Sequence, residues 1–408
     1  MQWFRKKGGL MDTQKDNSGN NCIVTRLQNV RPHSNADRLK LATVLGAQVI
    51  VGLESKDDDL VVYFDSNLRL SNQYLHVNNL YSNPELNIDK DVKGYFGRNG
   101  RVRAQKFRGE ISNGYVADLY SLSACMDIYD EEMFQEGMEF THINGVKICE
   151  KYVVPTKHIQ GQSRKIISDM FHRHWETKQL MREIESIPDG ASCWIEEKIH
   201  GTSGRTGHVL CKTNKKWWRF WKPKEEWKVV SGTRRVDNIN CHISDTRQEI
   251  ERRVAPHLHK GEEIYYEIYG YDGGKCIQAG FPYDCRGGEW KAMLYRVTIT
   301  TPDGFCIDLD REDVYRRAEE LGLEKPYHIT EGVITRWFSD LDKTNIQNIT
   351  FFAAGQSRLD IGTLCEGVVI WFKNHYNKWQ ALKYKSEEFL IDQDKRIENE
   401  QGDVEDSL

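Results

Sequence analysis

The stretch that decides the fold reads EEKIHGTS and runs from Glu196 to Ser203. It places Lys198 three residues before Gly201 and puts two carboxylates directly ahead of the lysine. Because glycine has no Cβ, the backbone can come close to a ligand at this turn, where the lysine can present its amine to a phosphate. The same spacing also fits a strand end with one solvated lysine, so other segments must decide between the two interpretations.

Five further segments follow in a fixed order along the chain. They are SGTRR (231–235), YYEIYG (265–270), MLYRV (293–297), EGVVI (366–370) and LKYK (382–385). Together with the first stretch, this series resembles motifs I, Ia, III, IIIa, IV and V of the lysine-adenylating nucleotidyltransferases. That superfamily comprises RNA ligases, DNA ligases and mRNA capping enzymes, and the resemblance covers roughly residues 165 to 390.

The form of the first motif is similar to the RNA ligase 2 branch, because DNA ligases usually have aspartate where His200 stands. The resemblance implies an ATP-dependent RNA ligase that joins 3′-OH and 5′-phosphate ends in RNA repair or nick sealing. Such an enzyme forms a lysyl-AMP on Lys198 and then an AMP-capped 5′ end.

The proposed chemistry requires an unprotonated amine, whereas an ordinary lysine has a pKa near 10.4. Nearby positive charge favours the neutral form. Lys383 and Lys385 alternate with Tyr384, so a strand would place both ammonium groups on one face, where they could bind the α-phosphate. The resemblance assigns Glu267 and Glu366 to Mg²⁺ or Mn²⁺; two carboxylates suffice because Mg²⁺ keeps much of its water.

The remaining site residues are carried over from the resemblance. Glu197 corresponds to a residue that recognises the adenine edge, and Tyr295 to an aromatic ring that stacks on adenine, although Arg296 stands where many relatives have aspartate. Arg234 matches an arginine near the ribose or the 3′-OH, with Arg235 as the alternative register. His200 matches a position that serves later steps, and Gly201 belongs to the nucleotide-binding set. Ser203 or Arg205 is a further candidate for the ribose.

Composition limits the kind of protein. With 408 residues and a net charge of −4 there is no global basic field, so a nucleic-acid surface must be a local patch. Ten scattered cysteines without a Cys-x-x-Cys pair argue against a zinc site or a disulfide framework and favour reduced thiols in the cytoplasm or nucleus. No apolar run approaches the length of a membrane span. We expect a monomer with RNA as its partner.

The domain prediction has four parts and an α+β fold. Residues 1–21 are predicted as a disordered tail, 22–155 as an OB-like nucleic-acid-binding β-barrel, 156–391 as the nucleotidyltransferase domain and 392–408 as an acidic tail. The barrel prediction rests on short alternating apolar runs and on a segment, 31–39, that resembles OB-fold tRNA-binding domains. The second domain is predicted to be ATP-grasp-like or DNA-ligase-type, with antiparallel sheets and flanking helices.

The order of these domains carries information. Only some 23 residues follow Lys385, which leaves no room for the OB domain that DNA ligases and capping enzymes usually carry there. A barrel ahead of the lysine motif resembles RNA ligases of the Deinococcus and Naegleria type. A basic cluster in the predicted barrel (Arg98, Arg101, Arg103, Lys106 and Arg108) is a candidate RNA contact.

Three local predictions complete the analysis. Residues 166–187 are expected to be mainly helical, and 310–321 a helix followed by Gly322. The basic-aromatic stretch from Trp217 to Lys224 either stacks on bases or packs on its own domain.

Two other functions remain open. One is a DNA-nick ligase or a GTP-using capping enzyme, against which the missing C-terminal OB domain and the His200 motif count. The other is a non-catalytic nucleic-acid-binding protein, against which the full set of Lys198, Glu267, Glu366, Lys383 and Lys385 counts.

Overall fold

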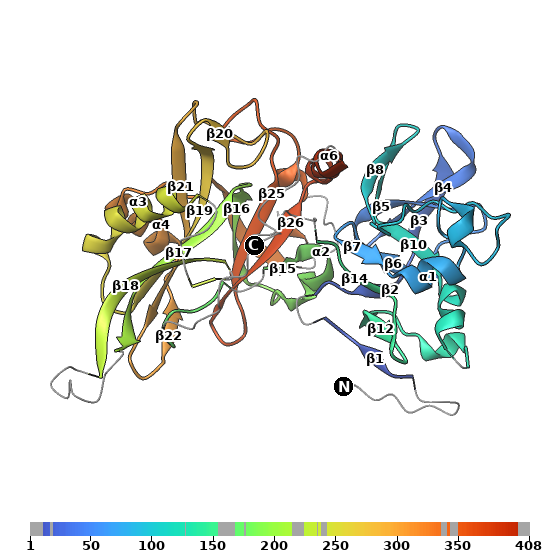
Figure 1. The fold of residues 1–408 in the computed structure, drawn as a ribbon, viewed down its shortest axis with the longest axis horizontal. Coiled ribbons are helices and arrows are strands. Elements are labelled where there is room, and N and C mark those ends of the chain that lie inside the picture. Colours follow the sequence, from blue (N-terminus) through green and yellow to red (C-terminus); the bar gives the residue numbers. More distant parts are fainter. Residues whose placement is uncertain are drawn as a thin grey trace. The chain divides into compact units, whose positions relative to one another are not determined.

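The computed structural model describes residues 11–16, 19–126, 128–153, 168–174, 177–213, 224–234, 236–237, 243–335, 341–342 and 350–398. The chain divides into two compact units. Unit 1 comprises Met1–Val153 and Leu390–Glu398, and unit 2 comprises Val154–Phe389 and Asn399–Leu408. The fold is α+β with mainly antiparallel sheets, as the sequence predicted (Figure 1).

Unit 1 is built from short strands and a few helical turns. Its strands are β1 (Thr13–Gln14), β2 (Cys22–Arg26), β3 (Gln28–His33), β4 (Ala36–Val44), β5 (Ala47–Val51), β6 (Leu60–Phe64), β7 (Leu68–Leu70), β8 (Ala104–Phe107), β9 (Glu110–Asn113), β10 (Tyr115–Asp118), β11 (Glu139–Phe140), β12 (His142–Ile143), β13 (Val146–Lys147) and β14 (Cys149–Lys151). Its helices are α1 (Asn72–Val77), capped by Ser71, and the 3-10 turns Pro84–Leu86, Leu119–Cys125 and Glu131–Met133.

The short apolar runs on which the barrel prediction rests do form strands in unit 1. They form separate sheets, with orders β10-β6-β2-β11, β3-β4-β5, β1-β12-β13, β14-β7 and β8-β9. In the part of unit 1 that the structure describes, these sheets do not close into a barrel, so the predicted OB barrel is not confirmed. The expected disordered tail is wrong for β1, which pairs with β12.

Unit 2 contains two large sheets. The first has the order β15-β26-β25-β16-β23-β24, and the second has the order β18-β17-β19-β21-β22 with β20 beside β19. The strands are β15 (Lys178–Gln179), β16 (Ser192–Lys198), β17 (Thr202–Lys212), β18 (Glu225–Thr233), β19 (Glu262–Asp272), β20 (Lys275–Cys276), β21 (Trp290–Thr300), β22 (Cys306–Asp308), β23 (His328–Thr335), β24 (Leu341–Asp342), β25 (Gly367–Lys373) and β26 (Trp379–Lys385).

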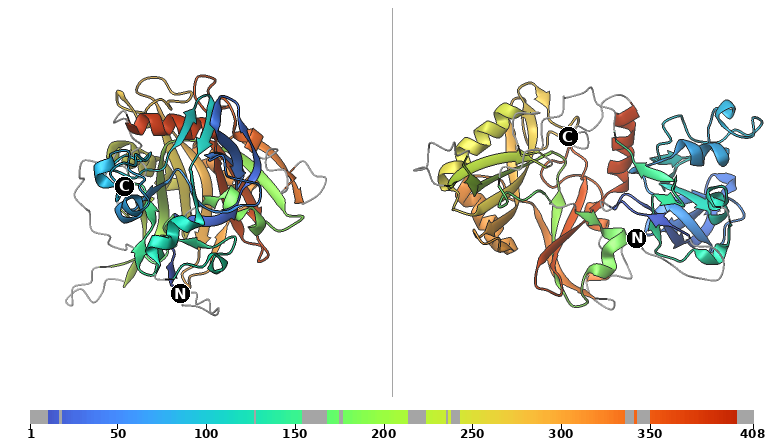
Figure 2. Two further views of the ribbon diagram at one scale, coloured as in Figure 1. Left: turned by 90° about the vertical axis from the view of Figure 1, so that its right-hand side faces the viewer. Right: turned by 60° about the horizontal axis from the view of Figure 1, so that its bottom comes forward.

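Helices α3 (Ser244–Val254) and α4 (Arg311–Leu321) cover one face of the second sheet (Figure 2). Ile264, Tyr266 and Ile268 of β19 pack against them, so the alternate residues of β19 face the other way. Helix α4 confirms the prediction for 310–321 and ends at Gly322, whose positive φ of 64° lets its N–H reach the last carbonyls of the helix.

The predicted helix over 166–187 is wrong for most of its described length. Residues Lys178–Gln179 form β15, which pairs in parallel with β26, and only α2 (Leu180–Glu183) with the turn Ile184–Ser186 is helical. Before β15, the backbone N–H of His172 donates to the Glu263 carboxylate rather than to a helical turn. Partners from distant strands therefore override the local helical pattern.

Helix α6 (Glu387–Glu398) corrects the predicted acidic tail, because residues 392–398 continue a regular helix. Its first turn belongs to unit 2, where Phe389 is fully buried beside Ile199 and Phe281. From Leu390 onward it belongs to unit 1, where Leu390 and Ile391 pack against Ala104.

Candidate active site

A cavity in unit 2 is lined by both sheets and collects most of the predicted site residues. Its lining residues are His174, Thr177, Glu196, Glu197, Lys198, Ile199, Ser203, Arg234, Glu267, Met293, Tyr295, Pro326, Val369, Trp371 and Lys383. The sequence therefore predicted six of the residues around it: Glu197, Lys198, Arg234, Glu267, Tyr295 and Lys383.

Strand register explains why these side chains meet. In the first sheet, Lys198 pairs with Gly367, which in turn pairs with Lys385. Residues directly opposite on neighbouring strands share a face, as do residues two apart on one strand. Lys383 therefore joins Lys198 and Lys385 on one face, and the predicted alternation of the two lysines around Tyr384 is confirmed.

The second sheet supplies the opposing row. Ser203 of β17 pairs with Glu267 of β19, which pairs with Met293 of β21, and all three line the cavity. Ser203 Oγ donates a hydrogen bond of 2.8 Å to Glu267 Oε2. This bond orients the Glu267 carboxylate, whose side chain is otherwise almost fully buried.

The turn between β16 and β17 requires Gly201. A Cβ at this position would lie 2.4 Å from the carbonyl oxygen of Ile268 and 2.9 Å from Glu267 Cγ. The absence of a side chain thus lets the lysine-bearing strand approach β19, and Gln278 Nε2 donates to the Gly201 carbonyl at 2.8 Å. Gly201 itself does not line the cavity.

Glu366 organises the charges behind the cavity. Its Oε2 lies 2.7 Å from Lys198 Nζ, and its Oε1 lies 3.3 Å from Lys385 Nζ. Burial alone would raise the pKa of this carboxyl, but Lys198 and Lys385 outweigh burial and hold the pKa at about 2. Glu366 is therefore ionised at every physiological pH.

Lys383, in contrast, lies in an environment that disfavours its charged form. Its burial, together with the positive charges of Lys385, Arg234 and Lys198, lowers its pKa to about 7. Lys198, Arg234 and Lys383 line the cavity, Lys385 lies beside Glu366, and these cations together disfavour protonation of Lys383. An arriving phosphate would relieve this repulsion, because an anion stabilises the protonated form of each lysine.

His200 is buried, with an exposed fraction of 4%, which excludes the surface imidazole considered from sequence. Its ring meets Phe281 and Phe389 edge to face, at centroid distances of 4.9 and 5.0 Å. His200 Nδ1 lies 3.8 Å from Glu366 Oε2, and its backbone N–H donates to Tyr283 Oη. The histidine therefore packs behind Lys198, next to the first turn of α6.

Two adjacent glutamates have different environments. Glu197 alternates to the other face from Lys198, and its carboxylate accepts hydrogen bonds from Ser357 Oγ at 2.5 Å and the Arg358 N–H at 2.9 Å. Its adenine contact stays a prediction. Sequence reasoning missed Glu196, which shares the face of Lys198, although counting two residues back along the strand would have found it.

Glu196 anchors the wall beside the cavity. The Arg311 guanidinium forms an ion pair with it, Tyr315 Oη donates to it at 2.9 Å, and Trp371 Nε1 donates at 3.0 Å. Arg311 Nη1 also donates to the Tyr295 carbonyl at 2.7 Å. The strand that carries the predicted adenine-stacking ring is thereby fixed to the strand that carries Lys198.

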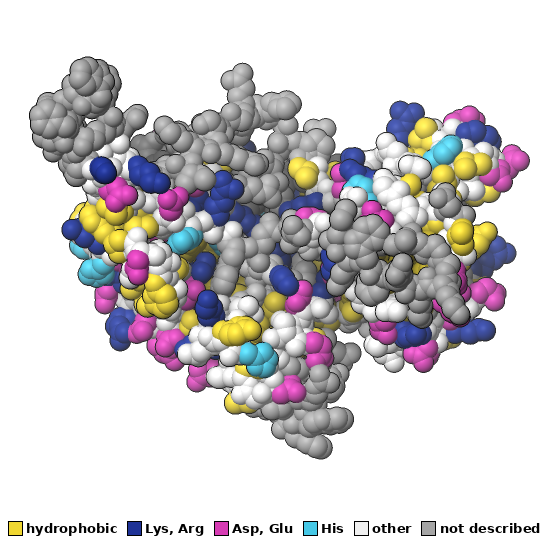
Figure 3. Space-filling model, turned by 90° about the horizontal axis from the view of Figure 1, so that it is seen from below, with side chains coloured by type: hydrophobic (Ala, Val, Ile, Leu, Met, Phe, Trp, Pro, Cys, Tyr) yellow, Lys and Arg dark blue, Asp and Glu magenta, His cyan; other side chains and the backbone are white. Residues whose placement is uncertain are grey.

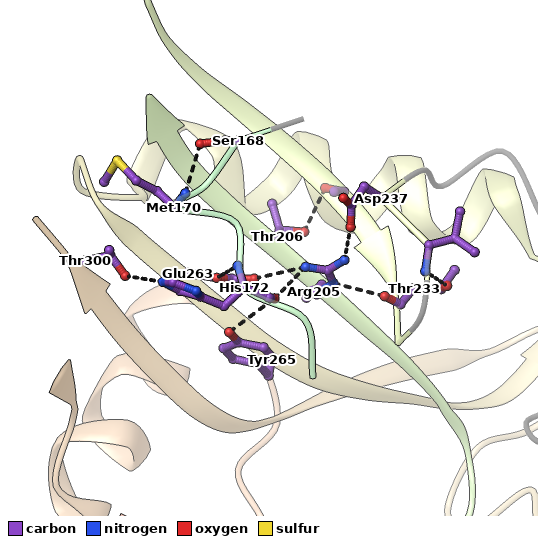
Figure 4. Close-up of polar contacts among 12 residues, drawn as sticks. Ser168, Met170, His172, Arg205, Thr206, Thr233, Asp237, Glu263, Tyr265 and Thr300 are labelled. Carbon is purple, nitrogen blue, oxygen red and sulfur yellow. Dashed lines mark hydrogen bonds and ion pairs between the residues drawn. The ribbon is translucent and has the colours of Figure 1, made fainter. Parts of the chain in front are cut away.

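Arg205 is not a ribose contact, which corrects one of the sequence candidates. It is 1% exposed and lies in a closed cluster with Asp237, Glu263 and the carbonyl oxygens of His172 and Thr233 (Figure 4). Its guanidinium stacks on Phe171 at 4.0 Å. Ser203, the other candidate, does line the cavity.

Arg296 also points elsewhere. It forms an ion pair with Asp308 of β22 and stacks over the Tyr265 ring at 4.9 Å. The pair that Arg296 forms with Asp308 on the neighbouring strand therefore explains why arginine stands where many relatives have aspartate. Arg235 and Trp217–Pro223 lie outside the described residues.

The predicted metal ligands fit a hydrated cation. Within the described ranges, no group of three or more His, Cys, Asp or Glu side chains could enclose a metal directly. Glu267 and Glu366 offer hard carboxylate oxygens, and Mg²⁺ or Mn²⁺ held by two carboxylates keeps several waters. When bound, such an ion would polarise the phosphate oxygens of a nucleotide.

Comparison with known proteins adds the fold class. No family model matches the chain, and no curated protein matches it. The fold, however, is similar to that of solved RNA ligase structures. It is similar to the Naegleria gruberi RNA ligase with pyrophosphate, at 18% identity and a TM-score of 0.62 over 92% of this chain and 99% of that one.

Two further solved structures from the same organism agree. A variant with ATP and manganese is 17% identical, with a TM-score of 0.61 over 90% of this chain and 98% of that one. A variant with AMP and manganese is 17% identical, with a TM-score of 0.57 over 90% and 97%. At these identities the similarity establishes the fold alone. The activity of this chain has to be argued from its own residues.

Proposed function

We propose that the chain is an ATP-dependent RNA ligase that acts through a lysyl-AMP intermediate on Lys198. The observation that carries the proposal is the arrangement of Lys198, Lys383 and Arg234 around one cavity, with the buried Glu366 paired to both Lys198 and Lys385. The similarity to ligase structures that hold ATP, AMP and manganese supports the same assignment.

In the first step, Lys198 Nζ would attack the α-phosphorus of ATP. The N–P bond forms, the α–β phosphoanhydride bond breaks, pyrophosphate leaves and the amine loses its proton to solvent. Before the attack, Lys198 must leave its 2.7 Å pair with Glu366, since that pair stabilises the ammonium form. Lys383 and Lys385 would bind the α-phosphate while charge develops on it.

In the later steps, a 5′-phosphate oxygen would attack the adenylate and break the N–P bond, which returns Lys198 to its amine form. The 3′-OH then attacks the activated 5′-phosphate, and AMP leaves. Arg234 and Tyr295 line the cavity. Arg234 would contact the ribose or the 3′-OH end, and Tyr295 would stack on adenine. His200 would act as a positioning residue behind Lys198.

The finer assignments belong to the same proposal. We infer that the metal is Mg²⁺ or Mn²⁺ at Glu267 and Glu366, that the partner is RNA and that unit 1 is an OB-like nucleic-acid-binding domain. The cysteines in the described residues are free thiols, which supports a reducing compartment such as the cytoplasm or nucleus. The structure has no helix long and apolar enough to span a membrane among its described residues.

The decisive experiment separates adenylation from sealing. Lys198→Met should abolish covalent labelling by α-labelled ATP, because the nitrogen nucleophile is removed. The same variant should still seal RNA that already carries a 5′-AMP cap, because that step bypasses the lysine. Lys212→Met is the matched control, since Lys212 lies exposed at the end of β17, and it should label normally.

Denaturing electrophoresis after incubation with labelled ATP or GTP reads out the first step. Label on the Lys198→Met protein would show that the nucleophile is misassigned. Label from GTP would indicate a capping-type enzyme, and sealing of nicked DNA in preference to RNA would indicate a DNA ligase.

A further inference from the structure

The cavity of unit 2 changes in character along strand β25. Lys198 of β16 pairs with Gly367, and Lys383 of β26 pairs with Val369, so cationic side chains lie along this first part of β25. The next residue on the same face is Trp371, two positions further on. The charged part of the cavity suits a phosphate, and the part from Val369 to Trp371 offers apolar and aromatic surface that suits a base.

The outer surface of the chain is a poor source of selectivity between nucleotides. On the face drawn in Figure 3, lysines and arginines are interspersed with acidic side chains, in keeping with the net charge of −4. A surface of mixed charge attracts one nucleotide as well as another. Selection between nucleotides must therefore come from an enclosed site such as this cavity.

Trp371 is the last residue of β25 that lines the cavity. It is 4% exposed, and Lys373, the next residue on the same face, lies outside the lining and pairs with Asp310 at 2.7 Å. Glu196, which pairs with Val369, is likewise the last lining residue of β16 toward this end. The indole therefore stands at the end of the cavity that lies away from the lysines along β25.

Two buried side chains hold Trp371 in place. Its Nε1 donates to Glu196 Oε2 at 3.0 Å, and the Arg311 guanidinium lies over its ring at 4.3 Å. Arg311 is itself 2% exposed and donates through Nη1 to the Tyr295 carbonyl at 2.7 Å. Since Glu196 uses the one N–H of the indole, the ring presents only carbon surface to a base. This wall is apolar, and it cannot move aside without breaking the buried bond to Glu196.

We propose that Trp371 is a specificity-determining residue, which limits the cavity to purine nucleotides without a bulky substituent on the exocyclic amine N6. The inference rests on the proposed adenylation of Lys198, which places the α-phosphate at the lysines. From Gly367, opposite Lys198, to Trp371 the strand advances by about 13 Å. The ribose and base of one nucleotide fill such a length. The six-membered ring of the purine, from which N6 projects, lies farthest from the ribose and therefore meets the indole.

Steric exclusion predicts that a smaller side chain at position 371 admits a larger base. Trp371→Phe, Trp371→Leu and Trp371→Ala shorten the wall in steps. Trp379→Ala is the matched control, because Trp379 lies on the same face of β26 as Lys383 but outside the lining, with its N–H on Asp310. Each full-length protein receives an equimolar mixture of ATP and N6-benzyl-ATP with Mg²⁺. Mass spectrometry of the intact protein separates the two lysyl adducts, each of which forms with release of pyrophosphate.

The ratio of the two adducts measures the preference in kcat/KM. Wild type should prefer ATP by at least about 10²-fold. The preference should fall stepwise from Trp371→Phe to Trp371→Ala, which should lose about 10²-fold of it while ATP labelling falls less than about 10-fold. Trp379→Ala should keep the wild-type preference. Because Trp371→Phe changes the volume least, it carries the test where the smaller variants do not fold.

Three results would overturn the proposal: equal use of both nucleotides by wild type, an unchanged preference in the Trp371 variants that label with ATP, or equal relaxation by Trp379→Ala. Calorimetric titration with AMP and N6-benzyl-AMP, which needs no covalent step, separates this failure from that of the ligase proposal. The same ranking of variants in binding, without any labelling by ATP, overturns the ligase proposal and leaves the wall standing. Labelling by ATP, with equal binding of both nucleotides to wild type, overturns the wall alone.

Discussion

Unit 2 holds two buried charged clusters that look alike as residue types and differ in balance. Around Arg205, one guanidinium meets the carboxylates of Asp237 and Glu263, and each of its nitrogens contacts an oxygen. Around Lys198, several cations share the single buried carboxylate of Glu366. The first cluster is closed, whereas the second has an excess of positive charge beside a cavity.

The difference indicates which of the two buried charge clusters is suited to bind an anionic ligand. A closed cluster gains nothing from a ligand, because its donors are already used, and removing one partner leaves a charge buried and unpaired. A cluster with excess positive charge gains from an anion, and burial together with the neighbouring positive charges lowers the pKa of Lys383. The charge surroundings thus distinguish a structural arginine from the lysines proposed to be catalytic, where residue type alone does not.

We expect the largest effects from Lys383→Met, which should lose adenylation activity, and from Arg205→Met, which should lose stability. Lys383→Met should reduce Lys198 adenylation by about 10³-fold, as for other lost transition-state donors, and leave the melting temperature unchanged or higher. Arg205→Met should cost about 3–5 kcal/mol of unfolding free energy, since it leaves Asp237 buried and unpaired. Adenylation rates and denaturant unfolding of both proteins measure this; the reverse pattern would refute the comparison.

A smaller effect is expected from Glu366→Gln, which removes the counter-charge of the catalytic cluster. Glu366 has a pKa of about 2, so the neutral amide removes both the anionic partner of Lys198 and Lys385 and one of the two carboxylates proposed to hold the metal. Adenylation should fall about 10²-fold. Single-turnover labelling gives the rate, with Glu263→Gln as the control that changes the same residue type in the closed cluster and keeps most activity.

The smallest effect concerns the pH dependence of stability at Glu263, whose pKa burial raises to about 7. Because this lies above the unfolded value, its stabilising contribution is complete below pH 4.5 and is lost as pH rises through 7. Glu263→Gln mimics the protonated form, so the stability of the variant relative to wild type should increase by roughly 1–3 kcal/mol between pH 5 and pH 8. Urea unfolding at both pH values tests this, and a difference that does not change with pH contradicts it.

The sequence predicted the catalytic face because the relevant information is local. Two lysines around Tyr384 and a lysine followed by a Gly turn fix which face each side chain takes, and strand pairing then brings the faces together. The closed cluster was missed because Arg205, Asp237 and Glu263 come from separate segments. The residue spacing within one strand does not indicate that a carboxylate from a distant segment will pack against it.

Two regions were predicted least well: residues 166–187 and the residues of helix α6. The pattern of residues 166–187 resembles a helix, but pairing of Lys178 and Gln179 with β26 satisfies the backbone there instead. Residues 392–398 were predicted to belong to an acidic tail, but they continue helix α6, whose Leu390 and Ile391 pack in unit 1. In both places, contacts across long sequence distances outweigh local composition.

Helix α6 makes unit 1 discontinuous in the chain, and this bears on how the protein is made. Arg101 is synthesised nearly three hundred residues before Asp394, its buried partner. Until the ribosome reaches the last helix, unit 1 holds an uncompensated guanidinium and lacks the cover that Leu390 and Ile391 give to Ala104. Unit 1 can therefore complete its folding only after unit 2 has been translated, so co-translational folding would run from the middle of the chain outward.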